Sequence, residues 1–241
     1  MNNTQNPKHS FWEKLMFFTG LKKQPVKVYF IPGMCNSCTV FDDLVLPAGY
    51  EKIYLEWHIP DENETLNEYA RNMAKDIDTS RPFILVGYSL GAVIMQEMNT
   101  FLSPLKNIVI SSMKSADEIP SLFRFAEKVN FVKFVPRSIF GATKFITNIF
   151  TRFIYTMPTE TVAKCMVITD PQYVRWAVYN ITNWHPTIEC PRIYHIHGTK
   201  DQIFPVKQIK NAYIIENGDH LMVMEYADNV SRYIQKILLE K

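Results

Sequence analysis

The chain has 241 residues, of which 47% are hydrophobic, and 26 Lys and Arg residues stand against 24 Asp and Glu residues. This length supports one sizeable core with a substantial insertion, and no change in composition requires two independent domains. The net charge of +2 is spread along the chain without a basic stripe that could follow a phosphate backbone. The composition therefore argues against nucleic acid as a partner.

The beginning of the chain shows no pattern of a secretory leader, because Glu13 and Lys14 interrupt its apolar runs. No stretch of the sequence approaches the length of a membrane span. We therefore expect a cytoplasmic protein whose four cysteines are free thiols. A weak amphipathic pattern over residues 10–22 favours a helix that packs on the domain over one that lies on a membrane surface. Residues 1–24 are accordingly predicted to form an N-terminal helical extension.

Six short runs of β-branched and aliphatic residues recur along the chain, and each is too short for a helix. These predicted strands are residues 26–33, 52–57, 82–89, 106–112, 192–198 and 211–218. Helical patterns lie between most of them, at residues 65–78, 91–102 and 226–239. Nearly continuous apolar strands that alternate with helices predict an α/β fold, in which a mostly parallel sheet of about six strands is covered on both faces.

The interval 113–190 breaks this alternation, because 78 residues separate two strands where a crossover needs far fewer. Its helical patterns cover residues 120–129, 140–155, 159–166 and 171–180. We predict that residues 113–190 form a helical cap, inserted over the carboxyl edge of a core that consists of residues 25–112 and 191–241.

The predicted cap has an unusual composition. Between Pro120 and Pro158 it holds eight phenylalanines and six Lys or Arg residues, while Glu127 is the only acid. Packing of short helices on the core accounts for most aromatic residues of this kind. A functional interpretation is a hydrophobic acyl pocket with a basic rim, which would steer anionic substrates or face an anionic lipid surface.

A serine stands at the end of the third predicted strand, in the sequence GYSLG. Ser89 is flanked by Gly87 and Gly91 and is followed at once by a helical pattern. A turn this sharp strains the serine backbone and leaves no room for side chains two residues away on either side. It would also direct the N-terminus of the next helix toward the Ser89 hydroxyl. Taken alone, the motif is equally compatible with a glycine-rich turn that has no chemical role.

An acid and a histidine follow the last two predicted strands. Asp201 lies in HGTKDQIFP and His220 in NGDH, so both are expected at the same sheet edge as Ser89. A serine hydroxyl becomes a good nucleophile when a base removes its proton and a third group orients that base. We predict that His220 is the base and that Asp201 orients it. Either residue alone is also compatible with an ordinary loop position.

The loop after the first strand is predicted to complete the site. Pro32 and Gly33 permit a tight turn that leaves the Met34 N–H free, and Leu90 follows the nucleophile directly. The Met34 and Leu90 amides are therefore predicted to form an oxyanion hole.

This order of serine, acid and histidine is similar to that of the α/β-hydrolase superfamily. The resemblance rests on GYSLG, HGTKDQIFP, the terminal GDH and the insertion after residues 106–112, and it covers essentially the whole chain. It implies an eight-stranded sheet, from which this chain is expected to lack the first two strands because no hairpin precedes residues 26–33. Many members carry His-Gly where this chain has Pro32 and Gly33. The cap resembles that of uncharacterised small hydrolases, for which the resemblance implies no substrate.

Two further patterns could suggest a metal site or a redox pair, but a structural role explains each of them better. Cys35 and Cys38 form a C-x-x-C pair, but the other two cysteines lie too far apart for a second zinc-ligand pair. A redox pair would need a thioredoxin-like strand-to-helix setting in place of this glycine loop. His195 and His197 alternate on a strand without acidic neighbours in sequence, which is typical of internally satisfied residues. We predict no metal and no cofactor.

Three functions are compatible with these residues. The leading hypothesis is a serine hydrolase that cleaves a carboxylic ester of a small to medium apolar acyl group through an acyl-enzyme. A second uses the same residues on a thioester or a carbon–carbon bond. A third is a small-molecule receptor that retains the three residues in its pocket and turns its ligand over slowly or not at all. The predicted partner is a small apolar ester, and the sequence predicts no oligomeric state.

Overall fold

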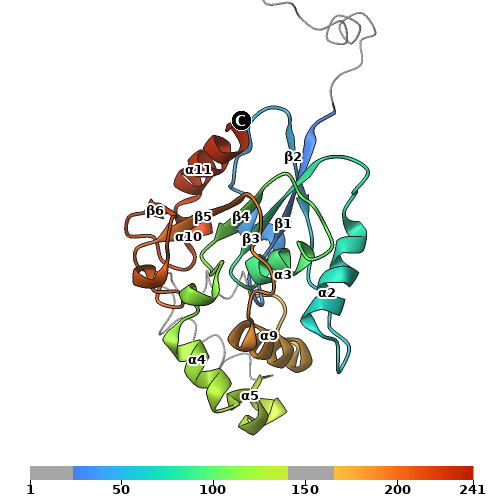
Figure 1. Ribbon diagram of the computed structural model, residues 1–241, viewed down its shortest axis with the longest axis vertical. Helices are drawn as coiled ribbons and strands as arrows, with labels where there is room; N and C mark the ends of the chain where they lie inside the picture. Colours follow the sequence, from blue (N-terminus) through green and yellow to red (C-terminus); the bar gives the residue numbers. More distant parts are fainter. Residues whose placement is uncertain (1–23, 141–165, 241) are drawn as a thin grey trace, which may run out of the picture.

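The computed structural model describes residues 24–140 and 166–240, which contain a six-stranded sheet in the order β2-β1-β3-β4-β5-β6 (Figure 1). All five neighbouring pairs are parallel. The strands are β1 (Val26–Ile31), β2 (Tyr50–Tyr54), β3 (Phe83–Tyr88), β4 (Asn107–Ile110), β5 (Ile193–Gly198) and β6 (Tyr213–Ile215). The predicted fold class is confirmed, with strand boundaries that differ from the prediction by up to three residues.

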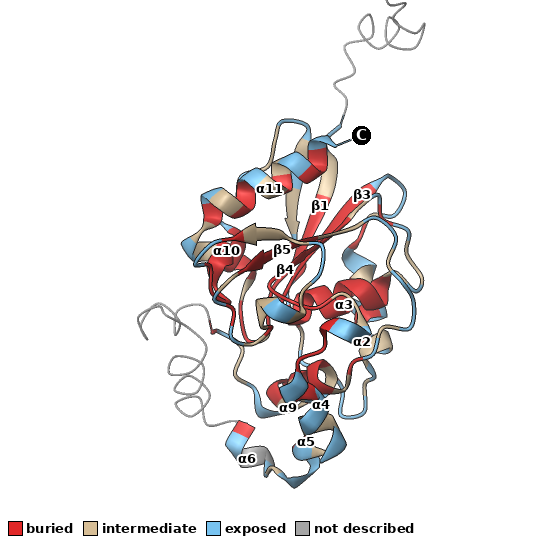
Figure 2. Ribbon diagram, turned by 60° about the vertical axis from the view of Figure 1, so that its left-hand side comes forward, coloured by how far each residue is buried: buried red, intermediate tan, exposed pale blue. Residues whose placement is uncertain are grey.

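Helices cover both faces of the sheet. On one face lie α2 (Leu66–Met73) and α3 (Leu90–Met98), and on the other lies α11 (Ala227–Leu239), with the short α10 (Met222–Glu225) before it (Figure 2). Thr65 and Glu68 form a capping box that begins α2. Every residue of α3 is buried, because this helix packs between the sheet and α2. Every residue of the central strands β3 and β4 is therefore buried, as their continuous apolar sequences require, whereas the edge strand β2 is partly exposed.

Four described helices come from the interval between β4 and β5. They are α4 (Ser121–Lys128), α5 (Phe131–Phe134), α6 (Arg137–Phe140) and α9 (Pro171–Asn183), called the inserted helices below. They lie at the end of the sheet to which the carboxyl ends of the strands point (Figure 1). The Asp170 carboxylate accepts hydrogen bonds from the Gln172 and Tyr173 amides, and Pro171 occupies the first turn, so α9 begins where its sequence favours it.

Some predicted helices cannot be compared with the structure. The pattern over residues 10–22 lies outside the described residues, and so does almost all of the patterns over 140–155 and 159–166. Met166, the last residue of these patterns, is described and forms an isolated antiparallel bridge with Asn36.

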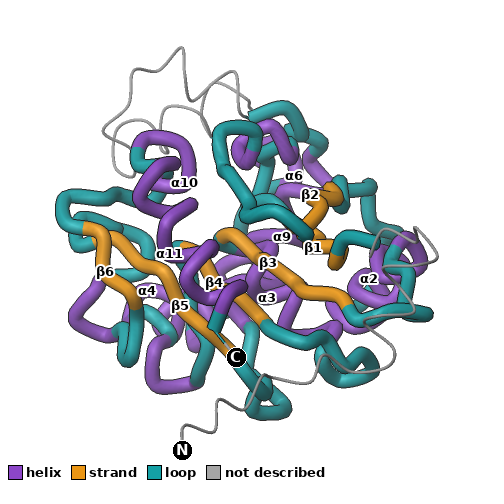
Figure 3. The backbone as a smooth tube through the Cα atoms, turned by 90° about the horizontal axis from the view of Figure 1, so that it is seen from above, coloured by secondary structure: helices purple, strands orange, loops and turns teal. Residues whose placement is uncertain are grey.

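The core is centred on the middle strands. All six residues of β3 are buried, and β3 runs beside β4, which separates it from β5 (Figure 3). The aromatic side chains of Tyr29 and Phe30 extend this core on β1. Within residues 24–140 and 166–240, no helix has both the length and the apolarity needed to cross a bilayer.

Candidate active site

The turn between β3 and α3 forces Ser89 into a strained backbone conformation, with φ 52° and ψ −120°. A Cβ atom at Gly87 would lie 2.5 Å from the Ala92 nitrogen, and one at Gly91 would lie 2.2 Å from the Ile31 carbonyl oxygen. Both contacts are with backbone, which cannot move aside as a side chain could. The two glycines are therefore required by close approach of the chain to itself, as the sequence predicted.

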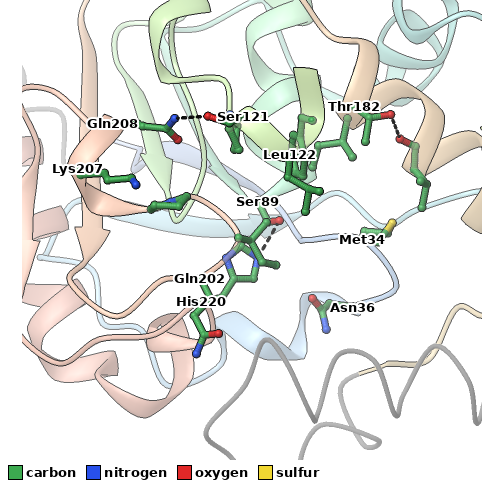
Figure 4. Close-up of a pocket in the computed structure, with 16 residues that line it drawn as sticks. Met34, Asn36, Ser89, Ser121, Leu122, Thr182, Gln202, Lys207, Gln208 and His220 are labelled. Atoms are coloured by element: carbon green, nitrogen blue, oxygen red, sulfur yellow. Dashed lines mark hydrogen bonds between the residues drawn. The ribbon is translucent and has the colours of Figure 1, made fainter. Parts of the chain in front are cut away.

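Ser89, His220 and Asp201 form a continuous hydrogen-bonded chain. Figure 4 shows the hydrogen bond between Ser89 and His220. The Ser89 Oγ lies 3.0 Å from His220 Nε2, and His220 Nδ1 lies 2.9 Å from an Asp201 carboxylate oxygen. Ser89, Asp201 and His220 follow β3, β5 and β6, respectively. Ser89 and His220 are 131 residues apart in sequence, and Asp201 and His220 are 19 residues apart. All three side chains are buried. The structure thus brings together the three residues that the sequence singled out.

Asp201 is held in its ionised form. Burial alone would raise its pKa, but the adjacent His220 imidazole and its hydrogen bond outweigh this effect and hold the pKa of Asp201 below its ordinary value. Its second carboxylate oxygen accepts hydrogen bonds from the Ile203 and Phe204 amides at 2.9 and 3.0 Å. An ionised Asp201 stabilises the His220 tautomer that carries its proton on Nδ1 and leaves Nε2 free to accept the serine proton.

The loop after β1 is anchored by two hydrogen bonds. The Gly33 carbonyl accepts the Trp57 indole N–H at 2.9 Å, and the Cys35 amide donates to the Tyr173 hydroxyl of α9 at 3.3 Å. A Cβ at Gly33 would lie 2.7 Å from the Tyr88 ring, so glycine is needed at this place as well. No sequence pattern indicated the roles of Trp57 and Tyr173, because both reach this loop through tertiary contacts.

The two predicted oxyanion donors have different surroundings. Met34 lines the pocket beside Ser89, whereas Leu90 is fully buried at the first turn of α3. Within residues 24–140 and 166–240, neither the Met34 nor the Leu90 N–H donates to a protein acceptor. Ser112, which the sequence did not single out, donates its hydroxyl proton to the Ser89 carbonyl at 2.9 Å and so stabilises the strained turn.

A pocket of about 600 Å³ opens at Ser89 and His220, between core loops and inserted helices (Figure 4). Eight of its sixteen described lining residues are apolar: Met34, Pro120, Leu122, Phe123, Val178, Ile181, Ile203 and Pro205. The remaining lining residues are Asn36, Ser121, Thr182, Gln202, Lys207 and Gln208. A cavity of this size and polarity fits a small organic ligand of mostly apolar character.

A second group of buried titratable residues lies behind the site. His195 Nδ1 lies 3.4 Å from the Lys114 ammonium and 3.9 Å from the Glu118 carboxylate, and Lys114 is hydrogen-bonded to Glu118. His195 has no acidic neighbour in sequence, but Glu118, at the start of the insertion, lies beside it in the fold. Burial lowers the pKa of His195 well below its ordinary value and also lowers the pKa of His197, despite the nearby Asp201 carboxylate.

Cys35 and Cys38 are buried free thiols that do not line the described pocket. Burial raises the pKa of the Cys35 thiol to about 12, and burial together with Glu56 raises that of Cys38 further. Both side chains therefore remain protonated at neutral pH, which makes them poor nucleophiles.

Comparison with known proteins agrees with this geometry. The sequence model of the alpha/beta hydrolase family matches residues 28–232. The chain belongs to the alpha/beta hydrolase family.

Solved structures of hydrolases share the fold of this family member at low sequence identity. An enol-lactonase from Burkholderia xenovorans is 12% identical, with a TM-score of 0.69 and coverage of 90% of this chain and 92% of that chain. A thermophilic esterase from Thermogutta terrifontis is 15% identical, with a TM-score of 0.64 and coverage of 89% and 90%. A carboxylesterase from Nitrososphaera gargenis is 12% identical, with a TM-score of 0.66 and coverage of 90% and 91%. The search of curated protein sequences gave no match. These neighbours share the fold of the alpha/beta hydrolase family.

Proposed function

We propose that this hydrolase cleaves carboxylic esters of small to medium apolar acyl groups through an acyl-enzyme intermediate. The observation that carries the proposal is the hydrogen-bonded chain from Ser89 through His220 to Asp201, which opens into an apolar pocket. Relatives of the fold include an esterase and an enol-lactonase, both of which act at an acyl carbon. We keep the cytoplasmic location as a prediction from the sequence.

The mechanism assigns one step to each group. The Ser89 Oγ attacks the ester carbonyl carbon while His220 Nε2 takes its proton, and the Met34 and Leu90 amides donate to the oxyanion. Collapse of the tetrahedral intermediate breaks the bond to the alcohol, which leaves with the proton from His220. Water then attacks the acyl-enzyme, with His220 as base again, and releases the carboxylic acid and the free serine. Asp201 keeps its charge throughout and stabilises the imidazolium.

The pocket sets the expected substrate range. We propose that residues 113–190 act as a cap on a core of residues 25–112 and 191–241, so that the apolar side chains of Val178 and Ile181 line the acyl site. A volume of about 600 Å³ accommodates acyl groups of short to medium length.

Steady-state hydrolysis of p-nitrophenyl esters with acyl chains from two to twelve carbons tests this proposal. We expect kcat to fall by roughly 10⁴-fold or more in Ser89→Ala and by roughly 10²- to 10⁴-fold in Asp201→Asn. His185→Ala is the matched control for His220→Ala, because His185 is exposed and pairs with Glu127 of α4. Equal rates for wild type and Ser89→Ala would refute the proposal.

Measurements on the same protein variants also distinguish two alternative functions that the sequence left open. A thioester hydrolase would show a higher kcat/KM on a thioester than on the ester with the same acyl group. A receptor would bind an apolar ligand with an affinity that survives Ser89→Ala, and it would release no product.

A further inference from the structure

We infer that Lys207 selects esters whose leaving alcohol carries an anionic group, either a carboxylate or a phosphate. The inference rests on the proposed function, because it concerns the same pocket and describes the half of the substrate that departs first.

Lys207 contributes the only Lys or Arg side chain to the described lining of the pocket, which contains no Asp or Glu. Its side chain is exposed, and within residues 24–140 and 166–240 no carboxylate pairs with it. Lys210, three residues further on, is instead paired with Asp117 at 2.8 Å. Among the described residues, the Lys207 ammonium thus has no paired carboxylate at the pocket wall, whereas Lys210 is paired with Asp117.

The groups around Lys207 are neutral and polar. Gln202 and Gln208 line the same part of the pocket, and the Gln208 amide donates to the Ser121 hydroxyl at 3.4 Å. Amide and hydroxyl groups can donate hydrogen bonds to an anionic oxygen without repelling it. An anion beside Lys207 would therefore meet one positive charge and several neutral donors, and no described carboxylate of the lining.

The position of His220 shows which half of the substrate meets Lys207. His220 Nε2 returns the proton to the leaving oxygen, so the alcohol must depart on the side of the His220 ring. The segment that contains Lys207 lies on this side, because Phe204 packs against His220 with ring centroids 5.7 Å apart. In Figure 4, Lys207 and Gln202 are drawn on the His220 side of Ser89, and Met34 lies on the other side.

The opposite part of the pocket is suited to the acyl group. Met34 stands beside the nucleophile, and Val178 and Ile181 of α9 supply apolar walls. The pocket is consequently divided into an apolar acyl end and a cationic leaving-group end. This division predicts a preference that an apolar ester series alone would not reveal.

Butanoate esters of three phenols test the inference: 4-carboxyphenyl, 4-phosphonooxyphenyl and the neutral 4-carbamoylphenyl ester. Each kcat/KM is divided by the rate constant for hydroxide hydrolysis, which corrects for leaving-group reactivity. We expect wild type to favour at least one anionic ester over the neutral ester by about fivefold, the size of one partly exposed ion pair. The two anionic esters distinguish carboxylate from phosphate as the preferred group.

The preference should fall to about one in Lys207→Gln and should reverse in Lys207→Glu. Lys128→Gln, which removes an exposed lysine of α4 outside the pocket, should retain it. Salt at 0.5 M should weaken it by screening. An unchanged preference in Lys207→Gln, or no preference in wild type, would overturn the inference while hydrolysis of the neutral ester upholds the proposed function.

If wild type hydrolyses none of the three esters, the proposed function fails. The anion preference of Lys207 is then tested by measuring ligand binding. Calorimetry with Ser89→Ala protein would then compare 4-hydroxybenzoate with 4-hydroxybenzamide. Tighter binding of the carboxylate that is lost in Ser89→Ala/Lys207→Gln supports an anion site at Lys207, and equal binding overturns it.

Discussion

The pocket has two walls that are built in different ways. On the core side, Ser89 and His220 are almost completely buried and hydrogen-bonded to each other, and the Ser89 amide donates to the Ile110 carbonyl. On the side of the inserted helices, Phe123 and Ile181 are buried, but Leu122 is 71% exposed although it is a large apolar residue. The geometry around Ser89 is thus fixed by close backbone packing, whereas part of the wall that the inserted helices contribute is exposed to solvent.

The largest expected effect comes from a substitution that disrupts the packing around Ser89. In Gly91→Ala, the new methyl group would meet the Ile31 and Pro32 carbonyl oxygens, so we expect a loss of about 3 kcal/mol in the free energy of unfolding, together with loss of activity. Gly49→Ala is the control, because Gly49 has φ +89° but no atom within 4 Å of an added Cβ. It should cost only about 1 kcal/mol. Urea unfolding of both variants checks the difference, and equal losses would contradict it.

A smaller effect concerns the buried histidine His195 and the pH dependence of the free energy of unfolding. His195 stays neutral in the folded protein because burial lowers its pKa, whereas in the unfolded chain it takes up a proton near pH 6.5. The unfolded state therefore binds more protons as the pH falls below 6.5, and stability should decrease by about 1.4 kcal/mol per pH unit for this residue. The low pKa of His197 should add to the slope.

Urea unfolding between pH 5.5 and 7.5 measures this dependence above the range in which carboxylates titrate. His195→Asn should have a shallower slope than wild type. His185→Asn is the comparison variant, because the His185 side chain is 54% exposed where it pairs with Glu127 on the side of the inserted helices. Parallel slopes for wild type and His195→Asn would contradict this account, because they would show that His195 binds protons equally in the folded and unfolded states.

The smallest effect concerns the wall formed by the inserted helices. Leu122→Ser removes an exposed apolar side chain that also lines the pocket, so stability should change by less than about 0.5 kcal/mol. We expect kcat/KM for an octanoate ester, relative to an acetate ester, to fall by about threefold, because the longer chain loses apolar contact. A large loss of stability or an unchanged ratio would show that Leu122 belongs functionally to the core.

The sequence predicted the parts of this molecule that local patterns determine. Continuous apolar runs predicted the six strands, and the glycines around Ser89 predicted a turn whose crowding the structure displays directly. The meeting of Ser89, Asp201 and His220 was predictable because the carboxyl ends of parallel strands share one edge.

Other contacts could not be predicted, because they depend on how distant segments pack. Glu118 approaches His195 across the boundary between the insertion and the core, and Tyr173 reaches the Cys35 amide from α9. The positive φ of Cys35, at 66°, also has no signal in its residue type. Such contacts arise from the fold as a whole, and periodicity or spacing along the chain carries no information about them.

The central claim is that Ser89 is an activated nucleophile, and covalent labelling tests it most directly. Wild-type protein would be treated with a fluorophosphonate, and its intact mass and labelled peptides would be measured. We predict one adduct per chain, located on Ser89, and no adduct in Ser89→Ala or His220→Ala. A folded wild-type protein that gains no adduct, or that carries the adduct on another pocket serine such as Ser121, would contradict the account.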